Sequence, residues 1–214
     1  MNKKNIAIWE EIYSKGLSNL KYPNEMLVRL FNRYYANNDV KRVLDFGFGA
    51  GANLIHIAES GCEVYGAEVS ESAIHLVEQK LKEKSLNAKL TKIENHILPY
   101  EDNFFDVVVA WQVLAYNNFQ SFEETMKEIS RVLKPGGLFI GTMTAVNDIT
   151  HAMSEKVGDC LFVSKVPNQI GATCIIVDKQ EIQQFFPNKV LDIGEYYFDL
   201  GGVVARHWVV TYEN

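Results

Sequence analysis

The stretch from Val43 to Leu54, VLDFGFGAGANL, constrains the fold of this chain more than any other. Apolar residues lead to Asp45, three glycines then alternate with small or aromatic residues, and a helical pattern of apolar residues begins at Leu54. Glycine adopts backbone angles that other residues avoid, and it lets a ligand approach the backbone closely. The following helix points its first N–H groups and the positive end of its dipole at whatever lies over the turn. The stretch therefore predicts a small-molecule site between a strand and a helix.

Two kinds of cofactor are compatible with this turn taken alone. Gly47-x-Gly49-x-x-Ala52 satisfies the dinucleotide-binding fingerprint. Asp45-x-Gly47-x-Gly49-x-Gly51 is similar to the first motif of the class I S-adenosylmethionine-dependent methyltransferases. The turn alone does not distinguish a dinucleotide from S-adenosylmethionine, so the distinction depends on the rest of the chain.

Composition narrows the class of protein. The 214 residues are 47% hydrophobic and 22% charged, which is enough for one domain with a full core. A net charge of −6 disfavours nucleic acid as a partner, because a sequence-independent grip on it needs a basic field. The three cysteines are widely spaced, which suggests free thiols in a reducing compartment. Without a membrane-length apolar run, we expect a cytoplasmic monomer or homodimer with no membrane partner.

Strand and helix patterns alternate after the turn, which predicts an α/β fold with a mostly parallel sheet. Glu68 ends the second predicted strand about twenty positions after Gly47, where a carboxylate can bind ribose hydroxyls. Ser70 follows as a helix cap. Residues 6–35 have helical spacing with breaks at Gly16 and Pro23. The strands are expected at 42–46, 62–69, 87–93, 104–110 and 138–143.

Four segments together resemble the class I S-adenosylmethionine-dependent methyltransferases, especially the type 11/25-like group that acts on small metabolites. They are VLDFGFGAGANL, VYGAEVS, ENHILPYEDNFFDVVVAWQVLAY and EISRVLKPGGLFIGTM, in the order and at the spacing of that family. Dinucleotide enzymes are not expected to carry the third and fourth segments, so the resemblance resolves the ambiguity. It covers residues 40–143 well. It implies a seven-stranded Rossmann-like sheet, mostly parallel with an antiparallel C-terminal hairpin, and helices on both faces.

The resemblance also implies S-adenosylmethionine as the cofactor and S-adenosylhomocysteine as its product. Family members usually have an aspartate where this chain has the longer Glu94. The residues that the resemblance places at the cofactor are Asp45, Gly47, Gly49 and Gly51 for the methionine part, Glu68 with Ser70 beside it for the ribose, Glu94 and Asn95 for the adenine edge, and Trp111 as a cover.

The chain is expected to form a single domain over residues 1–214. Its parts are a helical lid or cap (1–38), a cofactor-binding core (39–143), a variable substrate segment (144–187) and a C-terminal β-hairpin (188–214). Within the variable segment we expect a helix over 145–157, irregular or extended chain over 161–177, and a helix over 179–186 capped by Asp178. The sixth strand is expected at 190–200, and the last strand, 203–212, is expected to lie between the fifth and the sixth, as in the family.

Contacts with the acceptor are predicted from positions near the expected cleft. Tyr13 and Tyr22 flank a glycine and a proline, Tyr116 follows the fourth strand, and Arg206 opens the last strand.

A general base near neutral pKa would help if the acceptor is a hydroxyl. His151 and His207 are the candidates, since each falls near the expected cleft. No metal-ligand spacing is present in the sequence, so we expect no metal site.

The expected activity is transfer of a methyl group from S-adenosylmethionine to an oxygen or nitrogen of a small molecule. Alignment of nucleophile, methyl and sulfur can supply much of the rate enhancement, so a base is optional. One alternative is a non-catalytic protein of the same fold that binds the cofactor or a protein partner. The other is an NAD-dependent oxidoreductase, for which we find no nicotinamide-side catalytic residues.

Overall fold

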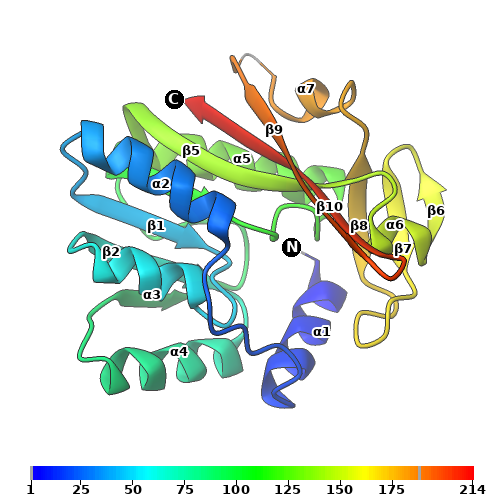
Figure 1. The fold of residues 1–214 in the computed structure, drawn as a ribbon, viewed down its shortest axis with the longest axis horizontal. Coiled ribbons are helices and arrows are strands. Elements are labelled where there is room, and N and C mark those ends of the chain that lie inside the picture. The colour runs from blue at the N-terminus through cyan, green and yellow to red at the C-terminus, as the bar shows by residue number, and fades with distance from the viewer. Residues whose placement is uncertain (1, 188) are drawn as a thin grey trace.

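The computed structural model describes residues 2–187 and 189–214, so Met1 and Asn188, which begin two of the predicted segments, lie outside it. Parallel strands form its centre in the order β3-β2-β1-β4-β5 (Figure 1). The strand order reverses beside β1, and ligands of such sheets bind at this point, outside the carboxyl ends of the strands. The strands are β1 (Arg42–Phe46), β2 (Glu63–Glu68), β3 (Lys89–Lys92), β4 (Phe105–Ala110) and β5 (Leu133–Ala145).

Helices cover both faces of this sheet, because strands that are apolar on both sides must be buried on both. The helices α2 (Glu25–Asn37), α3 (Ala52–Glu59) and α4 (Glu71–Glu83) pack on one face (Figure 1). The helix α5 (Phe119–Val132) packs on the other face. Successive residues of a strand point to opposite faces of the sheet. Val43 therefore packs in the core under α2, α3 and α4, and Leu44 packs in the core under α5, as the predicted layers require.

The C-terminal strands form the predicted antiparallel hairpin. Strand β9 (Asp192–Leu200) turns at Gly201 and Gly202 into β10 (Val203–Glu213). Strand β10 lies between β5 and β9 and is antiparallel to both. The expected place of the last strand is therefore confirmed.

The number of strands differs from the prediction, since the described residues form ten rather than seven. The additional strands are β6 (Ser154–Gly158), β7 (Leu161–Ser164) and β8 (Thr173–Val177). Strand β8 runs parallel to the end of β5, and β7 and β6 follow it as antiparallel neighbours. Strands β7 and β8 lie in the segment expected to be irregular or extended, whereas β6 lies mostly in the segment expected to be helical. The buried β8 and the exposed β6 share no single strand pattern, which is why the sequence did not predict these strands individually.

The helices of this segment are also shorter than predicted. The helix expected over 145–157 is wrong, because β5 continues to Ala145 and only one turn, α6 (Ile149–Ala152), follows. The second helix is reduced to α7 (Ile182–Phe185). Asp178 does accept hydrogen bonds, from the N–H groups of residues 180 and 181, but it closes a turn before the helix.

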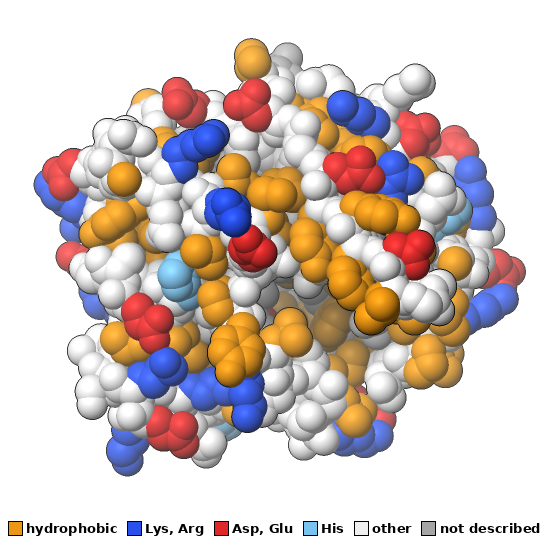
Figure 2. All heavy atoms as spheres, viewed as in Figure 1, with side chains coloured by type: hydrophobic (Ala, Val, Ile, Leu, Met, Phe, Trp, Pro, Cys, Tyr) orange, Lys and Arg blue, Asp and Glu red, His pale blue; other side chains and the backbone are white. Residues whose placement is uncertain are grey.

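The surface of Figure 2 mixes acidic and basic side chains and carries a band of hydrophobic ones over the region of β9 and β10. Exposed apolar residues there include Tyr197, Phe198 and Leu200.

Among residues 2–187 and 189–214, no helix combines the length and apolar character that crossing a membrane requires.

Candidate functional site

The turn between β1 and α3 has the glycine geometry that the sequence predicts. Gly47, Gly49 and Gly51 all have positive φ, at 69°, 52° and 78°, which glycine adopts without strain. The space over the turn is filled by the protein itself. A Cβ on Gly47 would overlap the side chain of Val113, and one on Gly49 would overlap the hydroxyl of Tyr13.

Two carboxylates lie buried beside this turn, at the ends of β1 and β2. Asp45 is 1% exposed, and its Oδ2 has no hydrogen-bond partner among the described residues. Glu68 is 5% exposed and accepts hydrogen bonds from the N–H groups of Gly49 (2.9 Å), Val69 (2.7 Å) and Ser70 (3.0 Å). Burial and the nearby Glu68 charge raise the pKa of Asp45 to about 7. Burial also raises the pKa of Glu68, and the three N–H groups oppose that rise.

Neither carboxylate has a basic partner in the described part of the chain. A buried charge without a partner is costly, so the pair favours a cationic ligand. The glycine turn binds Glu68 through Gly49 N–H, and the Oε2 atom keeps one lone pair for another donor.

The helix α1 (Lys3–Ser14) lies across the carboxyl ends of the strands and is bound to both sides of the site. At one side, Glu10 accepts hydrogen bonds from the hydroxyls of Ser70 (2.8 Å) and Ser72 (2.5 Å), at the start of α4. At the other side, the buried side chain of Asn5 exchanges two 2.9 Å hydrogen bonds with the backbone of Thr173 in β8. Ser70 itself caps α4 through Ala73 N–H, as predicted.

Two small cavities adjoin the glycine turn. Cavity A, of about 20 Å³, lies toward β3 and α5, and cavity B, of about 40 Å³, lies toward α1. Both are lined by Gly47, Glu68, Val69 and Val113, so they are two ends of one space. Cavity A adds Phe46, Ala67, Ile93, Asn95, His96, Asn117 and Thr125, and cavity B adds Trp9, Tyr13, Gln112 and Tyr116.

The aromatic residues of cavity B form a cover. Trp9 packs edge-on against Tyr116, with ring centroids 4.7 Å apart, and stacks on Tyr13 at 6.1 Å. The indole Nε1 of Trp9 is buried without an acceptor in the described residues. Gln112 has a φ of 55°, which is uncommon for a residue with a side chain and marks a constrained position at the end of β4. Sequence reasoning missed Trp9 and Gln112, because neither burial nor a positive φ is visible in the residue type.

Only one of the two residues predicted for the adenine edge lies at a cavity. Asn95 lines cavity A, whereas Glu94 is exposed and lines neither cavity. Asn117, which the sequence analysis did not select, is 2% exposed and lines cavity A. In the sequence it is indistinguishable from its neighbour Asn118, which caps α5 through Ser121 N–H.

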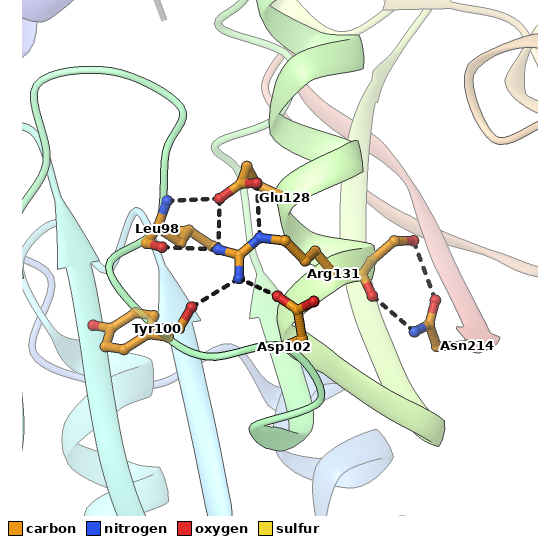
Figure 3. Close-up of polar contacts among 7 residues, drawn as sticks. Leu98, Tyr100, Asp102, Glu128, Arg131 and Asn214 are labelled. Carbon is orange, nitrogen blue, oxygen red and sulfur yellow. Dashed lines mark hydrogen bonds and ion pairs between the residues drawn. The ribbon is translucent and has the colours of Figure 1, made fainter.

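The wall of cavity A is supported by Arg131 of the RVLKPGG segment (Figure 3). Its guanidinium donates to the carbonyl groups of Leu98 (2.9 Å) and Tyr100 (2.8 Å) and to the carboxylates of Glu128 and Asp102. Glu128 in turn accepts from Leu98 N–H at 3.0 Å. These bonds fix the chain after β3, so Arg131 positions the loop that holds Asn95.

The predicted cofactor and substrate residues that line the cavities are Gly47, Glu68, Asn95, Tyr13 and Tyr116. Those that line neither cavity are Asp45, Gly49, Gly51, Ser70, Glu94, Trp111, Tyr22 and Arg206. Trp111 is buried in the core beneath α2, so the following residue, Gln112, lines the site instead. Tyr22 is 85% exposed in the connection between α1 and α2. Arg206 donates to Glu195 at 2.6 Å and lies over the ring of Trp208, 5.2 Å from its centroid.

The two candidate bases also lie outside the cavities. The Nδ1 of His151 accepts from Asn147 N–H at 3.1 Å, and its ring packs on Phe162. His207 lies 3.9 Å from the buried Asp148. Burial lowers the pKa of His207, although Asp148 opposes the shift, so the neutral form is favoured.

Larger concave surfaces occur elsewhere. A groove of about 690 Å³ between α5 and α7 is lined by Phe119, Phe122, Phe185 and Tyr212 among others, and it contains none of the predicted site residues. Within residues 2–187 and 189–214, no group of three or more histidine, cysteine or acidic side chains is placed to hold a metal ion.

Comparison with known proteins agrees with this geometry. Residues 44–141 match the family model of the methyltransferase domain. A sterol 4-C-methyltransferase of Caenorhabditis elegans is 33% identical over 99 residues, which cover 45% of this chain and 29% of that protein. The chain thus spans less than a third of the length of that relative.

Solved structures share the fold over nearly the whole chain. An S-adenosylmethionine-dependent methyltransferase from Methanosarcina mazei has a TM-score of 0.72 at 18% identity, covering 92% of this chain and 99% of its own. The 1,6-didemethyltoxoflavin-N1-methyltransferase of Burkholderia thailandensis, solved with S-adenosylhomocysteine, has a TM-score of 0.71 at 13% identity, covering 99% and 89%. The resemblance seen in the motifs is confirmed over residues 44–141, which match the methyltransferase-domain family model, and the chain has the fold of these solved S-adenosylmethionine-dependent methyltransferases.

Proposed function

We propose that this chain binds S-adenosylmethionine over the glycine turn and transfers its methyl group to a small-molecule acceptor. One observation carries the proposal: Asp45 and Glu68 are both buried beside the turn, and neither has a basic partner in the described residues. The cofactor brings an ammonium and a sulfonium, and its ammonium would supply the donor that Asp45 Oδ2 lacks. Its ribose would use the remaining lone pair of Glu68 Oε2.

The charge of Asp45 argues against NAD. A dinucleotide would bring a pyrophosphate to the turn beside this buried carboxyl group, and like charges at close range are repelled. The alternative of an NAD-dependent oxidoreductase therefore loses its support.

We propose that α1 is the lid of this site and that α2 belongs to the scaffold. Trp9 and Tyr13 reach the cavities from α1, whereas Leu27 and Phe31 of α2 are buried in the core. The cavities are too small for the cofactor, so α1 has to move for binding and then excludes water when it returns. All described strands belong to one sheet, which supports a single domain over 1–214.

The bound cofactor supplies an electrophilic methyl group on sulfur. The protein's part is to hold the acceptor in line with it, and the residues placed for this are Trp9, Gln112 and Tyr116 at cavity B. His151 and His207 lie outside the cavity, so we propose alignment rather than a histidine base as the main source of rate enhancement.

The acceptor atom is a separate matter. The sequence predicted oxygen or nitrogen, but one relative is named for a carbon of a sterol and one structural neighbour for a ring nitrogen. We therefore propose a small-molecule acceptor and include carbon, nitrogen and oxygen nucleophiles in its test.

Calorimetry with S-adenosylhomocysteine and with NAD tests the cofactor. We expect binding of the first alone, and Glu68→Gln should weaken it by about 1–3 kcal/mol through lost charge-assisted hydrogen bonds. Binding of NAD alone, or of neither ligand, would refute the proposal. Transfer of a labelled methyl group to a metabolite panel then tests the activity, and cofactor binding without any transfer would favour a non-catalytic role.

A further inference from the structure

The amide of Asn117 is a buried polar group with one unused atom. The residue lies between β4 and α5, is 2% exposed and lines cavity A. Its Oδ1 has no hydrogen-bond partner among the described residues. Such atoms are rare in folded proteins, because an unsatisfied buried acceptor costs stability.

The orientation of this amide is fixed by its other end. Asn117 Nδ2 donates to the carbonyl oxygen of Leu114 at 3.1 Å. A flipped amide would bring Oδ1 against that oxygen, and two acceptors repel each other. The oxygen is therefore the atom that remains for a ligand.

Three other polar side chains of cavity A already have polar partners. Glu68 accepts three backbone hydrogen bonds, Asn95 Oδ1 accepts from Ile97 N–H at 2.9 Å, and His96 lies 3.1 Å from Glu124. Most of the remaining wall is apolar, including Ile93 and Val113. A flat apolar ring with one N–H donor on its edge matches this lining.

We propose that Asn117 Oδ1 accepts a hydrogen bond from the exocyclic amine of a 6-aminopurine and selects adenine at this end of the site. The proposal rests on the proposed function, since Glu68 between the two cavities places the ribose and hence the base. A 6-oxopurine would face Asn117 with an acceptor instead of a donor. Cavity A holds about 20 Å³, so the ring has to displace part of its wall, and the exposed turn with Asn95 and Ile97 is the part that can yield.

The test compares the binding of S-adenosylhomocysteine and S-inosylhomocysteine by calorimetry on the full chain. The wild type should prefer the adenine compound by about tenfold or more, because the oxo compound leaves two acceptors opposed. In Asn117→Leu the preference should fall to about threefold or less, since no acceptor remains. Both ligands are measured on one preparation, so a partly unfolded sample leaves the ratio unchanged.

Gln120→Leu is the matched control, because Gln120 is exposed on α5 and lines neither cavity. It should keep the wild-type preference. Asn95→Ala tests the competing residue of cavity A, whose amide oxygen is engaged. Equal affinities in the wild type, or loss of preference in Asn95→Ala but not in Asn117→Leu, would overturn the assignment of Asn117. Binding of neither compound would refute the proposed function itself.

Discussion

The hydroxyl of Tyr13 occupies the space directly over the α-carbon of Gly49, where any Cβ on that glycine would overlap it. A residue of the first helix thus fills the space over the turn, where the proposed cofactor would lie, and Glu10 and Asn5 hold that helix in place. We therefore expect cofactor binding to begin with movement of α1.

Shortening Tyr13 should therefore ease binding. We expect Tyr13→Phe, which removes the hydroxyl over Gly49 and keeps the ring, to raise the association rate of S-adenosylhomocysteine in stopped-flow measurements. Tyr22→Phe is the control, because Tyr22 is 85% exposed and should leave the rate unchanged. An unaltered rate in Tyr13→Phe would contradict the obstruction.

Asp45 should make cofactor binding depend on pH near neutrality. Its pKa is raised to about 7, first by burial and then by Glu68, and only the ionised form attracts an ammonium. At one unit below its pKa about a tenth of a carboxyl group is ionised, so the dissociation constant should rise about tenfold from pH 8 to pH 6. Calorimetry across this range checks it, and a flat profile in the wild type would contradict it. Asp45→Asn should bind weakly at both values.

The same shift should make Asp45 a source of instability in the ligand-free protein. A folded-state pKa above the unfolded value of 3.8 favours the fold at low pH, and that contribution is lost as the pH rises toward about 7. Asp45→Asn should therefore raise the melting temperature at pH 8 and change it little near pH 4. A variant that melts lower than the wild type at pH 8 would count against an unpaired buried charge.

Glu10 should be needed to hold α1 on the core. Glu10→Ala removes the acceptor of the Ser70 and Ser72 hydroxyls, so amide hydrogen exchange in residues 3–14 should accelerate. Glu11→Ala is the matched control, since Glu11 is exposed and its carboxylate pairs, among the described residues, only with Lys15 at the end of the helix. Equal protection in the two variants would show that the contact with α4 is not what holds the helix.

Arg131 should stabilise the chain and shape cavity A. Arg131→Gln leaves Glu128 and the carbonyls of Leu98 and Tyr100 without their donor, and we expect a loss of about 1–3 kcal/mol in urea unfolding. Arg29→Gln, which breaks an exposed pair with Glu25, should cost about 0.5 kcal/mol or less. Similar losses for the two would indicate that the Arg131 bonds behave as ordinary surface contacts.

The parts of the fold that follow local rules could be predicted from the sequence. The strand 42–46 matches β1, Ser70 caps α4, and the hairpin packs beside β5 as expected. The segment after β5 could not, because β8 pairs with Thr144 and Ala145 through contacts between residues about thirty positions apart. The conformation of a turn is determined by a few neighbouring residues, whereas the pairing of a short strand depends on packing against strands that are distant in the sequence.

The candidate site shows the same division. The glycines and Glu68 carry their geometry in residue type and spacing, so their position could be predicted. Asn117 and Trp9 reach the cavities only through the packing of α5 and α1, and nothing in their sequence neighbourhood distinguishes them from ordinary core residues. Their roles, like those of the other site residues, stay predictions until they are tested.

The hydrogen bonds between Asn5 of α1 and β8 connect the proposed lid to the segment that follows β5. The amide exchanges hydrogen bonds with Thr173, so withdrawing α1, as the proposed lid requires, breaks two bonds to a strand of the segment that distinguishes this chain from the predicted seven-stranded sheet. We therefore expect the residence time of the proposed cofactor to depend on the packing of residues 161–177. A substitution there that suits a different acceptor should then alter how long the cofactor stays bound, without contacting it.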